Sequence, residues 1–288
     1  MIGAAWRARL DGEDLKEALE LVRICAEFDA EAGFTGVTEE AGTGPGPHLL
    51  VRRDADASLV AYACFTTEDG MTDGRFVVHP GFRSIGIATT LLELLGPDAA
   101  SWPVPGPVGG WADGHHPAAE RLARRFALPE TGRVWRTLRP LTGPHARPLP
   151  EPPSALTLTE APAPGEAVRL WEESGLPARY RPPVDGSARL LFAAGPGGGL
   201  VGYAWLDRRL RRVEGLRTGT LKAIVPAARG RGTGLALASG ALALLRADGA
   251  RAAEARVDPA LSRVVRMSRL LGFERTQDDV RYGLNMGI

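Results

Sequence analysis

Hydrophobic and polar residues follow one another along this chain in two successive rounds of the same pattern. In the first round, Leu15, Leu19 and Val22 share one face of a helix whose first turn is acidic. Apolar and β-branched runs that we expect to form strands flank this helix. The round comprises a short strand, the helix, two paired strands, and a strand that enters a glycine-containing turn and a second helix, at residues 6–10, 11–33, 48–54, 58–70, 75–80 and 81–96.

The second half of the chain repeats this order. Its strand, helix, paired strands, strand, and turn with helix are expected at residues 155–161, 165–175, 188–195, 199–209, 218–226 and 228–249. A repeat of this length indicates twin domains rather than a solenoid. A proline-rich segment separates the rounds, and such segments extend rather than pack. We therefore expect two domains, 1–142 and 156–288, joined by a linker at 143–155.

Each round places a turn rich in small residues between a strand and a helix. The turn reads Arg-x-x-Gly-x-Ala at 83–88 and Arg-x-x-Gly-x-Gly at 229–234. The first N–H groups of a helix lack internal partners and carry the positive end of its dipole, so such a turn can hold phosphate oxygens. One turn alone also fits a helix start without a ligand, whereas two copies behind equivalent strands favour binding of a diphosphate. No lysine follows either turn, which argues against an NTPase P-loop.

Composition and charge limit the kinds of binding partner that we expect for this chain. The chain has 288 residues, is 44% hydrophobic and carries a net charge of +1, as expected of a globular protein without a broad basic surface for nucleic acid. Cys25 and Cys64 lie in apolar runs, where we expect buried free thiols, and no histidine–cysteine cluster indicates a metal. Because no run of eighteen apolar residues and no signal-like start occur, we expect a cytoplasmic monomer or homodimer without membrane contact.

Three stretches carry a family resemblance. FVVHPGFRSIGIATTLL and AIVPAARGRGTGLALA resemble motif A of the GCN5-related N-acetyltransferases (GNATs), and ARVDPALSRVVRMSRLLGFE resembles the strand, helix and closing Leu-Gly-Phe of that family. The two halves together are similar to tandem acetyltransferases of the mycothiol synthase type. The resemblance implies an α/β (α+β) fold of two tandem GNAT domains, each a mixed, mostly antiparallel sheet flanked by helices with a splayed central strand pair. It also implies acetyl-CoA, or another acyl-CoA, as co-substrate and no metal.

The resemblance places the cofactor between the splayed strands. Strand backbone would pair with the pantetheine arm, and the turn would hold the pyrophosphate. The implied residues are, in the second half, Ala223, Ile224, Val225, Arg229, Gly230, Arg231, Gly232, Thr233 and Gly234, and in the first half Val77, Val78, His79, Arg83, Ser84, Ile85, Gly86, Ile87 and Ala88.

The usual ionisable helpers of the family are absent from the second half. The family tyrosine is replaced by Ser268, and the glutamate of the mycothiol synthase type is replaced by Thr218 in the second half and by Arg75 in the first. A serine hydroxyl donates a hydrogen bond but is a poor acid. Transfer then depends on positioning alone, with water carrying the protons, on Ser268, or on other side chains that could border the cleft. The remaining alternative is that one domain keeps the fold and has lost the activity.

The other candidates for a catalytic role are Glu214, Asp258, His79 and Tyr282, and each also fits a solvated loop charge or a structural position. The His115–His116 pair could indicate a metal or a base, but Pro117 favours the start of a helix.

Three functions are compatible with these features. We expect an acyl-CoA-dependent N-acyltransferase, with acetyl-CoA as donor and hence an N-acetyltransferase, that acts by direct attack of a small-molecule amine. We place its active site in the C-terminal domain, because the RGRGTG turn has more glycine and more positive charge than RSIGIA. The alternatives are a GNAT-fold transferase that uses aminoacyl-tRNA as donor and a non-catalytic acyl-CoA-binding module. The net charge argues against a broad RNA-binding surface.

Overall fold

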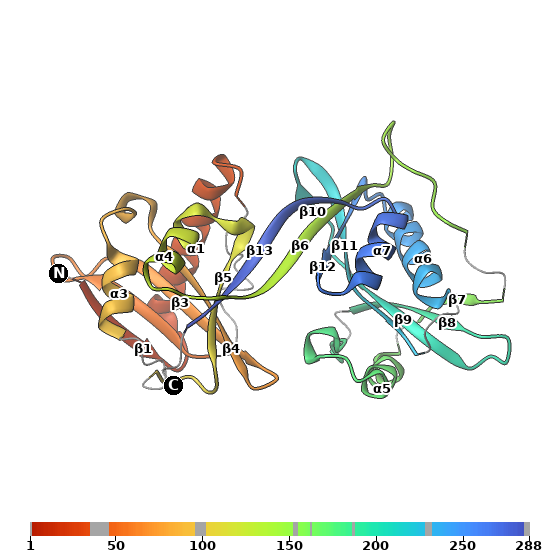
Figure 1. Ribbon diagram of the computed structural model, residues 1–288, viewed down its shortest axis with the longest axis horizontal. Coiled ribbons are helices and arrows are strands. Elements are labelled where there is room, and N and C mark those ends of the chain that lie inside the picture. Colours follow the sequence, from red (N-terminus) through yellow and green to blue (C-terminus); the bar gives the residue numbers. More distant parts are fainter. Residues whose placement is uncertain are drawn as a thin grey trace. The chain divides into compact units, whose positions relative to one another are not determined.

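The computed structural model describes residues 2–34, 46–95, 102–151, 155–161, 163–185, 188–227 and 232–284. The chain forms two compact units (Figure 1). The first unit contains Met1–Arg133 and Asp278–Ile288, and the second contains Val134–Gln277. No helix among the described residues is long and apolar enough to cross a lipid bilayer.

The first unit is a sheet in the order β1-β2-β3-β4-β5-β13. Its neighbours are antiparallel except for β4 and β5, which are parallel. The strands are β1 (Ile2–Arg7), β2 (His48–Arg53), β3 (Leu59–Glu68), β4 (Met71–Val78), β5 (Val108–Ala112) and β13 (Glu274–Gly283). The helices of this unit are α1 (Gly12–Glu31), α3 (Ile87–Leu95) and α4 (Pro117–Arg125), with short 3₁₀ turns η1 (Pro80–Phe82) and η3 (Asp113–His115).

The second unit repeats this plan in the order β6-β12-β11-β9-β8-β7, with β10 paired to β11. Only β11 and β12 are parallel among the strand pairs described. The strands are β6 (Glu130–Pro140), β7 (Thr157–Glu160), β8 (Ala188–Ala194), β9 (Leu200–Asp207), β10 (Arg211–Val213), β11 (Leu216–Pro226) and β12 (Ala252–Val257). The helices are α5 (Pro164–Ser174), α6 (Thr233–Ala247) and α7 (Ser262–Leu270), and η4 (Ala178–Tyr180) is a 3₁₀ turn.

The last strand of each half runs from one unit into the other. The end of β13 pairs with β5, from Val280 opposite Ala112 to Gly283 opposite Gly109. The end of β6 pairs with β12, with Pro140 opposite Ala252. The bounds of the two units therefore differ from the predicted domains 1–142 and 156–288. An alternating apolar pattern predicts a strand but does not say which sheet edge the strand joins.

Each unit has its own hydrophobic core. In the first, α1 buries Ala18, Leu21, Val22 and Cys25 against one face of the sheet. In the second, α6 is apolar almost all round, as expected of a helix enclosed by its neighbours. The predicted fold class, two mixed and mostly antiparallel sheets flanked by helices, is confirmed.

Candidate functional site

Both units contain a pair of parallel strands that separate after a few residues. The pairing of β4 with β5 runs only from Thr72 opposite Val108 to Gly74 opposite Gly110, although β4 continues to Val78. The pairing of β11 with β12 ends where Leu221 lies opposite Ala255, and β11 continues to Pro226. Beyond these pairs, the facing strand edges have no partner strand among the described residues. Each unit therefore has a V-shaped opening in its sheet, where an extended ligand can pair with the main chain.

In the second unit, the open strand carries a bulge at this point. The register of β11 against β9 shifts between Leu221 and Ala223, so Lys222 has no direct partner in that pairing. The side chains of Ala223 and Val225 are buried in the core. Bulges often re-aim a strand beside a functional site. The bulge leaves the main chain of 223–225 paired to β9 on one edge and open to the V on the other.

The turn that follows β11 leads into the N-terminus of a 15-residue helix. Gly232 is the N-cap of α6 with φ of 75°, a conformation that glycine adopts without strain. Thr233 and Gly234 begin the helix, whose first turn has no acidic residue. Arg229, Gly230 and Arg231 lie outside the described residues. The described part of this turn thus ends at the first N–H groups of α6, and their use to hold an anion stays a prediction.

In the first unit, the matching turn is held by its own side chains. The backbone of Ser84 and Gly86 has φ of 64° and 92°, and α3 begins at Ile87. Arg83 donates through Nε to the carbonyl of Val78 at 2.9 Å and forms an ion pair with Asp29. His79 accepts a hydrogen bond at Nδ1 from the N–H of Gly81. The side chains of Arg83 and His79 are therefore engaged within the protein, and Ile85 is exposed.

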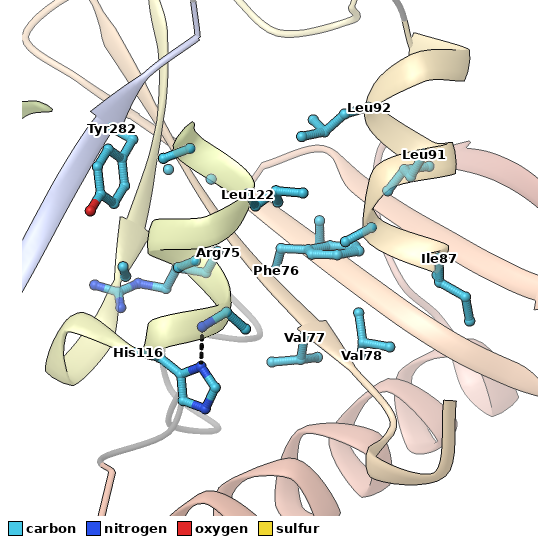
Figure 2. A pocket seen from close by; sticks show the side chains of 18 of the residues that line it. Arg75, Phe76, Val77, Val78, Ile87, Leu91, Leu92, His116, Leu122 and Tyr282 are labelled. Carbon is cyan, nitrogen blue, oxygen red and sulfur yellow. Dashed lines mark hydrogen bonds between the residues drawn. The ribbon is translucent and has the colours of Figure 1, made fainter. Parts of the chain in front are cut away.

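A cavity of about 990 Å³ occupies the V of the first unit (Figure 2). Of the predicted cofactor-binding residues, those that line it are Val77, Val78, Arg83, Ser84, Gly86, Ile87 and Ala88. Its other lining residues come mainly from β4, β5, α3 and α4, together with the last strand. One wall is apolar, formed by Ile87, Leu91 and Leu92 of α3.

Polar groups gather on the opposite wall of this cavity. Arg75 of β4 forms an ion pair of 2.6 Å with the buried carboxylate of Asp113. The hydroxyl of Tyr282, on β13, lies 3.3 Å from Nε2 of His115. Burial raises the pKa of Tyr282, so the hydroxyl stays protonated at neutral pH. Burial is also the main reason that the pKa of His116 is lowered.

Sequence reasoning did not bring these polar residues together. The sequence indicates Arg75 only as a replacement for a family glutamate and the histidine pair as a solvated helix start. It names Tyr282 as a residue that could border a cleft or pack as a strand residue, and the structure places Tyr282 in the lining of the first-unit cavity. The structure confirms the helix start, because His116 caps α4 and Pro117 is its first residue. One signal was available for the ion pair: an arginine beside the apolar run 76–78 needs a partner once it is buried.

The structure places the predicted catalytic side chains of the second unit in local contacts. The hydroxyl of Ser268 is buried and donates to the carbonyl of Val265 in its own helix, at 2.8 Å. Asp258 accepts a hydrogen bond from the N–H of Ala260 in the turn before α7. Glu214 is exposed at the turn between β10 and β11. From the start of β11 to its last pairing with β12 is roughly 17 Å along the strand, so Glu214 lies far from the V.

The part of the chain that the structure describes contains no group of three His, Cys, Asp or Glu side chains suited to hold a metal ion.

Comparisons with known proteins place this chain among acetyltransferases. No family model matches the sequence. A mycothiol acetyltransferase of Thermobispora bispora is 32% identical over 291 residues, which cover 93% of this chain and 95% of the relative. A mycothiol acetyltransferase of Salinispora arenicola is 29% identical over 304 residues, covering 95% and 94%.

Solved structures agree with the sequence relatives on the fold. A tandem GNAT protein from the clavulanic acid biosynthesis pathway matches with a TM-score of 0.72 at 17% identity, over 100% of both chains. A GCN5-related N-acetyltransferase from Sphaerobacter thermophilus matches with a TM-score of 0.68 at 20% identity, over 99% of this chain and 97% of the other. At this identity the likeness shows a tandem fold.

Proposed function

Because the chain belongs to the mycothiol acetyltransferase family of tandem GNAT proteins, we propose that it transfers an acetyl group from acetyl-CoA to the amine of a small molecule. The observation that carries this proposal is the 32% identity to a mycothiol acetyltransferase along 93% of the chain, through both units. The name of the relatives favours an acceptor of the mycothiol type. The chain is an N-acetyltransferase, and the identity of its amine is the part that needs experiment.

We propose that transfer takes place in the second unit, in the V between β11 and β12. The bulge at Lys222 and the open main chain of 223–225 support pairing with the pantetheine arm. The N-terminus of α6, with Gly232 and Gly234, supports binding of the diphosphate. The matching turn of the first unit remains a second predicted CoA site, although Arg83 is there engaged with Asp29.

Acetyl transfer from the thioester to the amine can proceed without an ionisable side chain as acid or base. The amine nitrogen attacks the thioester carbonyl, a proton leaves the nitrogen, and the C–S bond breaks to release the thiolate of CoA, which takes up a proton. Holding the two reactants in contact supplies much of the rate. Since Ser268 and Asp258 are used in local hydrogen bonds, positioning with water as the proton carrier is the mechanism that these contacts support best.

A matched pair of substitutions tests which unit is active. A Cβ at Gly234 would lie 3.7 Å from Sδ of Met267, an ordinary contact, so Gly234→Glu adds a charge without a clash. Ala88 is the equivalent position in the first unit. We expect Gly234→Glu to lower kcat/KM for acetyl-CoA at least tenfold, because the added carboxylate repels the diphosphate, and Ala88→Glu to leave it within a few-fold. Gly234→Gln and Ala88→Gln are controls for side-chain size.

The assay is release of the CoA thiol in the presence of small amines. Loss of turnover in Ala88→Glu alone would move the active site to the first unit. Thermal shifts with acetyl-CoA, CoA and charged tRNA identify the donor, because a ligand of the folded state raises Tm. Stabilisation by acetyl-CoA without thiol release from any amine would instead support a binding module, and stabilisation by charged tRNA alone would support the tRNA-dependent alternative.

A further inference from the structure

The first-unit cavity has walls of opposite character. On one side, Leu91 and Leu92 of α3 lie toward Phe76 and Leu122, as Figure 2 shows, and Ile87 of the same helix also lines the cavity. On the other side lie the guanidinium of Arg75, the imidazole of His116 and the hydroxyl of Tyr282. A large apolar cavity with a few convergent polar groups is the usual form of a small-molecule site. Its ligand should therefore have an apolar body and one polar end.

The three polar groups all supply hydrogen-bond donors. The guanidinium of Arg75 uses Nη1 for Asp113, and its other donors have no partner among the described residues. His116 accepts at Nδ1 from the N–H of Ala118, so the neutral ring carries its proton on Nε2. Since burial lowers the pKa of this imidazole, the neutral form prevails near pH 7. The raised pKa of Tyr282 keeps its hydroxyl protonated.

The acceptors near these donors are already in use. Asp113 is paired with Arg75, and Asp29 is paired with Arg83. Arg121 and Arg125 also line the cavity from α4, and Arg125 is paired with Glu93. An anion beside Arg75 would accept from the guanidinium donors that Asp113 does not use.

We propose that the first-unit cavity binds a carboxylate carried on an apolar body, with the carboxylate held by Arg75 and Tyr282. A planar guanidinium matches a carboxylate in two parallel hydrogen bonds, and the low dielectric of an enclosed apolar site strengthens them. The site is built from β4 and β13, so it exists only because the end of the chain joins the first unit.

Two kinds of ligand can supply a carboxylate on an apolar body. A free carboxylic acid can enter with its apolar body against α3. An acyl-CoA whose acyl group ends in a carboxylate can present the same group, if this cavity holds CoA as the first-unit turn predicts. Both place one carboxylate beside Arg75.

Calorimetry with matched probes tests the proposal and separates the sources. Octanoate and octanamide share one apolar body and differ in charge; succinyl-CoA and butyryl-CoA differ only by the terminal carboxylate. We expect the charged member of at least one pair to bind at least tenfold more tightly, because hydrogen bonds to a charged group are stronger than those to a neutral one. A preference in the first pair indicates a free acid, and in the second pair an acyl-CoA. Equal binding within both pairs, or no binding of any probe, would overturn the proposal.

Two variants locate the preference. Tyr282→Phe removes one donor and leaves the ion pair intact, and should weaken the charged probe several-fold. Arg75→Gln combined with Asp113→Asn replaces the ion pair by a neutral pair and should abolish the preference for charge while the uncharged probe binds as before. A preference that survives both variants places the carboxylate elsewhere and refutes the assignment.

The acyl-CoA probes are measured in the Gly234→Glu background, which is designed to exclude CoA from the second unit. Thiol release by the unaltered protein reports on the proposed function separately. Failure of acetyl transfer would therefore leave the carboxylate measurement intact, and the reverse also holds.

Discussion

Substitution of Gly109 by alanine should unfold the first unit more readily, because a side chain there meets the guanidinium of Arg281. A Cβ built on Gly109 would lie 2.4 Å from Cζ and 2.8 Å from Nε of Arg281. Ordinary contacts of such atoms are 3.4–4 Å, so Arg281 must move by about 1 Å or more. Arg281 is 7% exposed and lies on β13, the strand that reaches this unit from the end of the chain.

The hydrogen bonds of Arg281 set the size of the effect. Its Nε donates to Asp73 at 2.5 Å and its Nη1 to the hydroxyl of Thr131 at 3.0 Å. Overpacking costs about 1–3 kcal/mol of stability. A weakened hydrogen bond to a charged group costs about 1.5–3 kcal/mol. We use the lower value for the hydrogen bond because Asp73 is partly exposed. Against these costs, alanine in a strand stabilises the folded state by about 0.5–1 kcal/mol relative to glycine. We expect a net destabilisation of about 2–3 kcal/mol.

The neighbouring glycine supplies the control. A Cβ on Gly110 would meet only the carbonyl oxygen of Gly74, at 3.8 Å, so Gly110→Ala should leave stability within about 0.5 kcal/mol. Hydrogen exchange of first-unit peptides across a urea series measures both variants. Equal stabilities would refute the reasoning. In an Arg281→Ala background the clash is absent, so Gly109→Ala should cost little stability there. The same loss of stability in that background as in the unaltered protein would also refute the reasoning.

Further predictions concern buried polar groups. His48 lies 2.7 Å from the hydroxyl of Tyr62, and burial lowers its pKa. Below pH about 6.5 the imidazole is protonated in the unfolded chain but not in the folded state, so the free energy of unfolding should fall as pH drops. The fall in Tm between about pH 7.5 and 5.5 should therefore be smaller for His48→Gln than for the unaltered protein. Burial raises the pKa of Cys25 and of Cys64 to about 11; an aromatic disulfide reagent should label neither thiol in the native protein and both in urea, and native labelling would contradict their burial. Arg139, 2% exposed, donates to the carbonyls of Arg147 and Leu271. Arg139→Met should speed hydrogen exchange of the backbone amides at 145–147 several-fold, whereas an unchanged rate would mean that this contact does not hold the segment.

The sequence determined the elements and their order because these depend on local patterns. The helical spacing of residues 11–33 corresponds to α1, and the strand expected at 75–80 corresponds to β4, although β4 begins earlier, at Met71. The early start was not visible in the sequence because Thr72 and Asp73 are polar and interrupt the apolar pattern. Thr72 is nevertheless buried, and its hydroxyl forms hydrogen bonds with Pro105 and Thr67.

The two glycine-containing turns were also visible in the sequence, because a positive φ and a helix N-terminus need small residues wherever they occur. Gly86 and Gly232 both adopt positive φ at the start of a helix. The family relation followed from these same turns. Which side chains face the opening did not follow from the sequence. Ser268 was chosen by its place in the family motif and Asp258 because its segment could border the cleft, and both are used in local hydrogen bonds.

By itself, the sequence thus determined a duplicated fold with a glycine-containing turn before a helix in each half, because these features depend on local patterns. Only the tertiary structure decided which groups share the first-unit cavity. Arg75 and Asp113 are 38 residues apart, and Tyr282 is delivered by a strand from the other half of the chain. Strand pairing at a sheet edge uses main-chain hydrogen bonds that are the same for every residue, so no side-chain pattern could specify that exchange in advance.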